Sequence, residues 1–194
     1  NSTGAYLTKG VDENDIINAN IKMMQSIERY LAISNSTKLV INFSTLSVYG
    51  NLSNIPFIDH HTDARPIDLY GTSKLLAEQI LNSIKIKDLK VVHLRFPVVL
   101  GSGAHRAWLP SILQTLKQNS SLSLINPHKH YSCCTTMLNV ANFCLHLINT
   151  SSFERFPEVM PLGAIPDISI SDIVRTIMQK LESSSSISNY YNDN

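Results

Sequence analysis

YGTSK (residues 70–74) follows STLSVYG (residues 44–50) by about twenty residues, and these two segments decide the fold and chemistry expected of the chain. Tyr70 and Lys74 are four positions apart, and side chains at that spacing project from the same face of a helix. A cation about 4 Å from a phenol could lower its pKa of about 10 by up to about 3 pH units at an effective dielectric constant of about 20. Lys74 would then make Tyr70 a usable proton shuttle at neutral pH.

Thr45 stands at the end of an apolar stretch, residues 38–44, that reads as a buried strand. Its hydroxyl could there hold a substrate oxygen against Tyr70. A simpler interpretation stays open, because serine and threonine often form only turn hydrogen bonds at such positions. The same applies to the helix, where Lys74 and Glu78 form an ordinary i,i+4 pair and a tyrosine near a helix start is often simply packed.

With LRFPVVLGSG at residues 94–103, the two segments resemble the extended short-chain dehydrogenase/reductase family, and within it the NAD-dependent sugar-nucleotide epimerases and dehydratases. The resemblance covers about residues 1–182. It implies a Rossmann domain that binds NAD or NADP, a smaller C-terminal lobe that binds a nucleotide sugar, and a homodimer formed through the helices around 14–34 and 67–86. It also implies a catalytic triad, which falls on Thr45, Tyr70 and Lys74.

The resemblance also implies which residues contact the cofactor. Asn20 matches the family's helix asparagine near the cofactor, with Asn18 as the alternative, although both could be polar-face residues. Pro97 falls where the family brings backbone near the nicotinamide. The expected cofactor-binding residues are therefore Asn20, Thr45, Tyr70, Lys74 and Pro97.

Substrate contacts are expected from His105, Arg106 and Trp108, since an arginine can clamp a diphosphate and a tryptophan can stack on a base or sugar. Surface packing explains these residues equally well, and Ala107 stands where related epimerases tend to carry an asparagine. Thr45 is followed by Leu-Ser, without the acidic residue of the family's dehydratases and decarboxylases. An epimerase or a ketoreductase is therefore expected. For Arg95 we expect a structural role, either pairing with a carboxylate or capping carbonyls.

Hydrophobic periodicity predicts alternating helices and strands. The expected helices are 13–34, 67–86, 107–118, 137–149 and 170–182, and the expected strands are 38–44, 89–94, 121–125, 131–134 and 158–162. In the helix 67–86, Leu75, Leu76 and Ile80 are expected to face the core. The fold class is therefore α/β: a partial Rossmann-like parallel sheet, its C-terminal half, in residues 1–104, a small α+β substrate-binding lobe interleaved in 105–182, and a disordered polar tail in 183–194.

The seven glycines form no Gly-x-Gly-x-x-Gly loop, and Arg106 stands where a third glycine would follow Gly101 and Gly103. We therefore expect a fragment of a longer enzyme that by itself binds NAD(P) weakly or not at all. A parallel sheet without its first strands would leave an exposed edge that pairs with a partner. The alternative is a catalytically inactive truncated homologue that acts as a protein-interaction module along that edge.

The composition is ordinary for one soluble α/β domain, with 43% hydrophobic residues, 16% charged residues and a net charge of +1 over 194 residues. No basic cluster indicates nucleic acid, and no stretch approaches the ~20 apolar residues of a membrane span. Cys133, Cys134 and Cys144 lack zinc-site spacing even with His128 and His130 nearby, so no metal is expected. Reduced thiols in a cytoplasmic protein are expected instead.

Overall fold

A computed structural model describes residues 12–34, 36–51, 57–101, 108–128, 134–150, 152, 155–163 and 168–191. The chain divides into two compact units. The first unit holds residues 1–97 and 141–162, and the second holds residues 98–140 and 163–194. Every helix expected from the sequence is present, and the helix expected at 137–149 has the same bounds in the structure, as α5 (Met137–Asn149).

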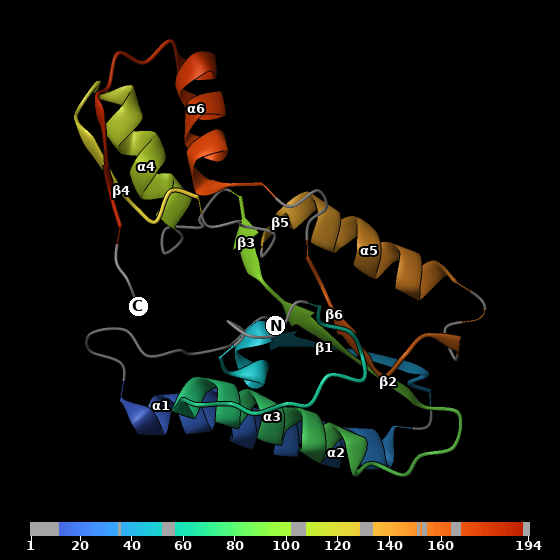
Figure 1. Cartoon of the computed structure of the whole chain (residues 1–194). Helices are drawn as coiled ribbons and strands as arrows, with labels where there is room; N and C mark the ends of the chain where they lie inside the picture. Colours follow the sequence, from blue (N-terminus) through green and yellow to red (C-terminus); the bar gives the residue numbers. More distant parts are fainter. Residues whose placement is uncertain are drawn as a thin grey trace. The chain divides into compact units, whose positions relative to one another are not determined.

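The first unit contains a parallel sheet of β1 (Leu39–Thr45), β2 (Lys90–Phe96) and β6 (Val159–Pro161), in the order β1-β2-β6 (Figure 1). This sheet confirms the expected α/β class. The register pairs Thr45 with Phe96, the last residues of their strands, and Pro97 follows directly. Thr45 and Pro97 therefore lie at the carboxyl ends of neighbouring parallel strands, where ligands bind in open α/β sheets.

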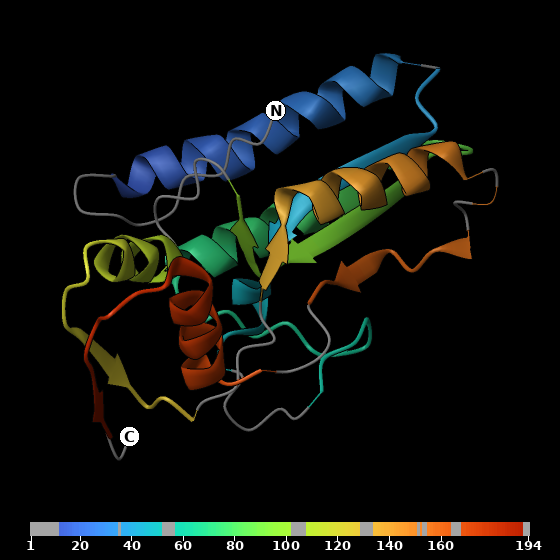
Figure 2. The same cartoon turned by 90° about the horizontal axis from the view of Figure 1, so that it is seen from above.

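Helices cover this sheet. The expected helix 13–34 is α1 (Glu13–Ile17), a π-helical turn η1 (Asn18–Lys22) and α2 (Met23–Ile33), and the second helix is α3 (Leu69–Asn82). Both views show α2 beside α3 (Figures 1 and 2). Their interface buries Met24, Ala77 and Leu81, which pack with Val40 of β1 and Val91 of β2. Burial of this apolar surface joins the helix pair to the sheet.

The buried face of α3 matches the expected one only in part. The sequence predicts that Leu75, Leu76 and Ile80 face the core; Ile80 does pack against Met24, Ala77 and Leu81, but Leu76 is 41% exposed. The residues that the structure buries in this part of the helix are Ala77, Glu78 and Leu81. The helix is turned in this way because its polar residue Glu78 has partners on the sheet, described below.

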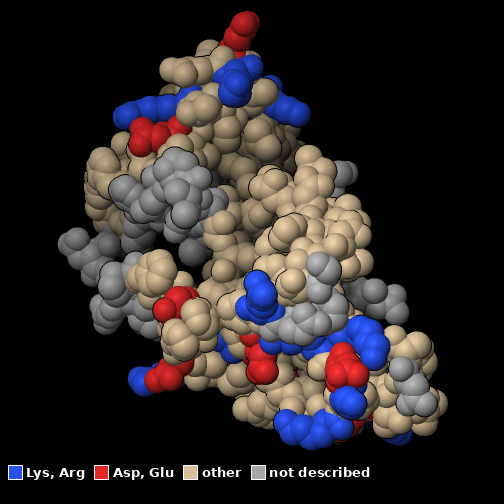
Figure 3. Space-filling view, turned by 90° about the vertical axis from the view of Figure 1, so that its right-hand side faces the viewer, with Lys and Arg blue, Asp and Glu red and all other residues tan. Residues whose placement is uncertain are grey.

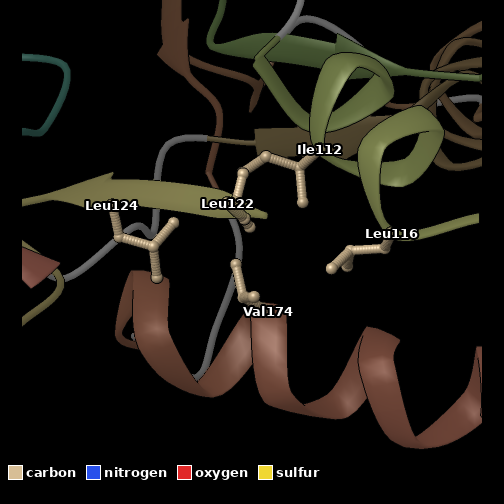
Figure 4. Packing of buried hydrophobic residues seen from close by; sticks show 5 residues of the cluster. All are labelled: Ile112, Leu116, Leu122, Leu124 and Val174. Carbon is tan, nitrogen blue, oxygen red and sulfur yellow. The ribbon is translucent and has the colours of Figure 1, made fainter. Parts of the chain in front are cut away.

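The second unit joins two small parallel pairs of strands with helices. β3 (Val98–Leu100) pairs with β5 (Cys134–Thr136), and β4 (Leu122–Ile125) pairs with β7 (Ile187–Tyr190). Beside β4 lie α4 (Trp108–Lys117) and α6 (Ile170–Leu181). Its core, drawn in Figure 4, consists of Ile112, Leu116, Leu122, Leu124 and Val174.

The polar segment after α6 differs from the expected disordered tail over 183–194 in its described part, residues 183–191; residues 192–194 lie outside the described residues. Residues 187–190 form β7, and Ile187 packs against the core of the second unit. The Ser183 hydroxyl donates to the Leu116 carbonyl oxygen at 2.7 Å, and Ser185 is buried. One well-placed isoleucine and these serine hydrogen bonds order a segment whose composition alone indicates disorder.

None of the helices among the described residues has the length and apolarity that a membrane crossing requires.

Candidate active site

Thr45 is both the last residue of β1 and the N-cap of a 3₁₀ turn, η2 (Leu46–Tyr49). Its Oγ1 accepts a hydrogen bond from the Ser47 amide at 3.2 Å and donates to the Ser47 hydroxyl at 3.3 Å. The residue is 9% exposed. The turn hydrogen bonds that the sequence left open are thus present, and they hold the hydroxyl at the strand end.

The first turn of α3, which carries Tyr70, lies directly against η2. Asp68 caps the helix, and its carboxylate accepts from the Gly71 amide at 2.6 Å. A Cβ atom at Gly71 would lie 2.5 Å from the Ser47 carbonyl oxygen, too close for any side chain. Glycine at this position therefore permits the close approach of the helix to the turn.

Lys74, one helical turn after Tyr70, reaches back to β1. Its Nζ donates to the Phe43 carbonyl oxygen at 2.8 Å. Burial lowers the pKa of the Lys74 ammonium, and the negative charge of Glu78 opposes part of that change. Phe43 and Ser47 stand two residues on either side of Thr45, and α3 contacts both of them. The structure therefore brings the elements that carry the three expected triad residues to one end of β1.

Glu78, one turn beyond Lys74, forms a buried ion pair with Arg95 of β2. Arg95 donates from Nη2 to Oε2 at 2.7 Å and from Nε to Oε1 at 3.1 Å, and the two side chains are only 6% and 3% exposed. The Ser44 hydroxyl also donates to this carboxylate. The structure confirms that Arg95 pairs with a carboxylate, and it identifies that carboxylate as Glu78.

The Arg95 guanidinium also lies over the ring of Tyr49, 4.7 Å from the ring centroid. Burial raises the pKa of the Tyr49 phenol, and Arg95 opposes part of the rise. The Tyr49 hydroxyl donates to the Asp59 carbonyl oxygen at 3.3 Å. Tyr49 is the last residue of η2, and Asp59 lies in the loop before α3. The ion pair therefore links α3 to η2, and Tyr49 links η2 to that loop.

A second polar set lies two residues earlier on the strands. His93 is fully buried, and its Nδ1 lies 3.0 Å from Asn42 Nδ2 while its Nε2 lies 2.8 Å from Asn82 Oδ1. The Asn42 amide nitrogen can only donate, so His93 Nδ1 accepts, and the Asn82 oxygen can only accept, so His93 Nε2 donates. These contacts assign a neutral ring with its proton on Nε2. Burial lowers the pKa of His93, Glu78 opposes this change, and Arg95 adds to it.

Sequence reasoning missed these buried polar sets, although a signal was present. Asn42 and Ser44 are two residues apart on β1, and His93 and Arg95 are two residues apart on β2. Residues at that spacing lie on the same face of a strand. Glu78 and Asn82 are four apart on one face of α3. Polar residues at matching periods in buried elements indicate that the elements bond to one another.

The other expected site residues fall in three groups. The Asn20 side chain is buried against α3, where its Nδ2 donates to the Ser73 hydroxyl at 3.0 Å, and Asn18 is exposed. Pro97 directly follows β2, and Trp108 begins α4. His105 and Arg106 lie outside the described residues. Within the described residues, no group of three or more His, Cys, Asp or Glu side chains is placed to hold a metal ion.

The model of the NAD dependent epimerase/dehydratase family matches residues 3–152, so the chain belongs to that family. No curated protein sequence matches the chain.

Solved structures share the fold. UDP-glucuronic acid 4-epimerase from Bacillus cereus in complex with NAD is 19% identical, with a TM-score of 0.82 over 96% of this chain and 60% of that chain. UDP-N-acetylglucosamine 4-epimerase from Methanobrevibacter ruminantium in complex with UDP-N-acetylmuramic acid is 19% identical, with a TM-score of 0.78 over 99% of this chain and 62% of that chain. RMD from Pseudomonas aeruginosa complexed with NADPH is 16% identical, with a TM-score of 0.78 over 96% of this chain and 67% of that chain. The chain spans about three fifths of the length of the two epimerases.

We predict that Glu78→Gln destabilises the fold by about 3–5 kcal/mol, because it leaves the Arg95 charge buried without its counter-charge. Arg95→Met combined with Glu78→Gln should cost less than the sum of the two single changes, because it removes the unpaired charge. The measurement is the free energy of unfolding in urea. The control is Asp88→Asn, which removes an exposed pair with Lys38 and should cost at most about 1 kcal/mol. Additive losses in the Glu78 and Arg95 variants would contradict the prediction.

We also predict that acid destabilises the protein through His93. The pKa of His93 is lowered in the folded state from about 6.5 in the unfolded chain, so its contribution to stability is complete above about pH 6.5 and is lost as the pH falls towards the folded pKa. His93→Gln should flatten the fall in unfolding free energy between pH 7 and pH 5 by up to about 1.4 kcal/mol per pH unit. His60→Gln, at an exposed histidine, should leave the wild-type slope, and equal slopes in wild type and His93→Gln would refute the prediction.

Proposed function

We propose that the chain is part of an NAD(P)-dependent enzyme that epimerises or reduces a nucleotide sugar by hydride transfer. Family membership supports NAD(P) chemistry, and the matched epimerases supply the class of sugar. The observation that carries the proposal is the pair of contacts around Thr45. Lys74 binds the Phe43 carbonyl and Gly71 abuts the Ser47 carbonyl, so the turn that carries Tyr70 is fixed at the same strand end as the Thr45 hydroxyl.

The residues present fit the nicotinamide-ribose end of NAD(P). Lys74 has three donor hydrogens and uses one of them on Phe43. Two remain for ribose hydroxyls, and the side chain lies near the carboxyl end of β1, where parallel sheets bind ligands. Pro97, at the end of the neighbouring strand, would offer backbone to the nicotinamide. A glycine-rich loop for the pyrophosphate is not part of these 194 residues.

Bound NAD(P) would supply the hydride acceptor and donor. In our proposal Thr45 orients the sugar hydroxyl that is oxidised, and Tyr70 takes up and returns its proton. Lys74 favours the phenolate of Tyr70 through its positive charge. Leu46 and Ser47 follow Thr45 without an acidic side chain, which favours epimerisation or ketone reduction over elimination. His105, Arg106 and Trp108 remain the candidates for substrate contacts.

Tyr70→Phe in the full-length protein should lower turnover about 10²–10⁴-fold, because it removes the proton-transfer group and leaves the rest of the site intact. The measurement is NAD(P)H absorbance, or product analysis for sugar interconversion, with a panel of UDP-sugars. Cofactor affinity should stay within a few-fold of wild type. The matched control is Tyr30→Phe, because Tyr30 is 61% exposed on α2. Equal turnover by wild type and Tyr70→Phe would remove the phenol from the mechanism.

A second function, protein interaction without catalysis, is favoured by one observation. α5 contains no charged residue over its whole length and exposes four large hydrophobic side chains, Met137, Leu138, Leu145 and Ile148. Figure 3 shows a view in which much of the described surface carries neither Lys and Arg nor Asp and Glu side chains. Exposed apolar patches often mark interaction sites. Within the described residues, β1 also pairs on one side only, as an interaction edge requires.

If this second function holds, the double variant Leu145→Glu, Ile148→Lys should raise the dissociation constant for self-association of the chain at least tenfold. The reason is that the new charges on α5 would have to be desolvated in the complex. Sedimentation velocity over a range of concentrations measures the association. Ile125→Lys is the control, since Ile125 is 59% exposed in β4, away from α5 in sequence. Association that is unchanged by the α5 variant would exclude α5 as the contact surface.

A further inference from the structure

Two opposite charges of α3, on Lys74 and Glu78, are bound to neighbouring residues of β1. The two side chains are four positions apart and project from one face of the helix. Lys74 Nζ donates to the Phe43 carbonyl oxygen at 2.8 Å, and the Ser44 hydroxyl donates to the Glu78 carboxylate. Phe43 and Ser44 are consecutive residues, whose Cα atoms are about 3.8 Å apart. The fold therefore holds the carboxylate next to the ammonium.

The charge of Lys74 needs support from its surroundings. The side chain is half-buried, and burial lowers the pKa of its ammonium by favouring the neutral amine. A neutral amine could not favour a phenolate at Tyr70. The negative charge of Glu78 opposes the effect of burial on Lys74. At a separation of about 6 Å, the rise of four helical residues, and an effective dielectric constant of about 20, one charge changes the pKa of another group by up to about 2 pH units.

The Glu78 carboxylate is fixed in place by three donated hydrogen bonds, two from Arg95 and one from Ser44. The other titratable groups around the pair are Arg95 and His93 on β2, Tyr49 at the end of η2 and Tyr70 on α3. The charged side chains of α1, η1 and α2 are exposed, apart from the half-buried Glu28. Glu28 accepts from the Ser83 hydroxyl at 3.4 Å, at the C-terminal end of α3. Glu78, which is 2% exposed, is thus the buried negative charge beside Lys74.

We propose that Glu78 acts on the acid–base chemistry through Lys74: its negative charge keeps the lysine ammonium protonated, and the ammonium in turn keeps Tyr70 usable as an acid and base at neutral pH. Glu78 is a positioning residue in this scheme, since it acts through another side chain. The proposal rests on the proposed function, in which Lys74 favours the Tyr70 phenolate. It gives the buried carboxylate a chemical role besides its structural role in the ion pair with Arg95.

The test measures the pKa values of Lys74 and Tyr70 by NMR titration of the full-length protein, labelled with carbon-13 at lysine Cε and tyrosine Cζ. Lys74→Arg and Tyr70→Phe assign the two signals. In Glu78→Gln the pKa of Lys74 should fall by at least about 1 pH unit, because the ammonium loses its neighbouring negative charge. The pKa of Tyr70 should rise, because the amine beside it is charged over a narrower pH range.

Both directions are diagnostic. A general loosening of the site would admit water and raise the pKa of Lys74, and a direct effect of the lost negative charge would lower the pKa of Tyr70. The matched control is Glu28→Gln. It alters a contact with Ser83, nine residues or about 13.5 Å along the helix from Lys74 and beyond a Debye length of about 8 Å. This control should leave both pKa values as in wild type.

An unchanged or raised Lys74 pKa in Glu78→Gln would overturn the proposal, and so would an unchanged or lowered Tyr70 pKa. Should Glu78→Gln fail to fold, the double variant Glu78→Gln, Arg95→Met decides, since it leaves neither charge of the pair buried alone. Its Lys74 pKa should also lie below the wild-type value, because Glu78 is held at the strand residue next to the one that binds Lys74. A Lys74 pKa at or above the wild-type value in the double variant would overturn the proposal.

Activity separates this proposal from the proposed function. Failure of the proposed function appears as a wild-type protein that converts no sugar, whereas failure of the Glu78 proposal appears in the titrations. In an active enzyme, the acid limb of the pH profile of kcat/KM for sugar oxidation should move to higher pH in Glu78→Gln, together with the Tyr70 pKa. An acid limb that stays in place would overturn the link from Glu78 to Tyr70.

Discussion

The ion pair between Glu78 and Arg95 is the interaction on which the geometry of the site depends. It joins α3 to β2 directly, to β1 through the Ser44 hydroxyl, and to η2 through the ring of Tyr49. A buried charge is tolerated only while its partners stay in place. Any shift of one of these elements would leave a charge unpaired, so the carboxyl end of the sheet and the helix that carries Tyr70 and Lys74 must keep one arrangement.

The spacing of the helix matches the spacing of the strands. Four residues of an α-helix rise about 6 Å, and two residues of a strand advance about 6.6 Å. Asn82 and Glu78 can therefore meet His93 and Arg95 in turn. Lys74 and Tyr70 continue the same helical stripe towards the carboxyl ends of the strands. A slip of one residue between β1 and β2 would separate Asn42 from His93 and Ser44 from Arg95, so the polar pairs also specify the register.

The helices and the fold class could be predicted from the sequence because hydrophobic periodicity is a local property. The catalytic triad rests on a family resemblance alone and stays a prediction. Long-range pairing could not be predicted in this way. Glu78 read as a partner of Lys74 under the i,i+4 rule, which describes a solvated helix, whereas in the fold its carboxylate binds Arg95. The same contact explains why Leu76 faces outward. The segment after α6 was misjudged because composition gives no weight to the packing of Ile187 on a distant core.

The polar interior between α3 and its neighbours is better explained by precision than by stability. Well-packed hydrophobic residues in place of a buried ion pair are often neutral or stabilising. Apolar contacts are non-directional, however, and let packed elements slide, whereas a hydrogen bond near 2.9 Å weakens steeply when its geometry changes. A helix that only had to be stable would need no Glu78, Ser73 or Asn82 on its buried side. Under the proposed function the helix has to hold Tyr70 within about 0.5 Å of a productive position, and directional contacts of this kind meet that requirement.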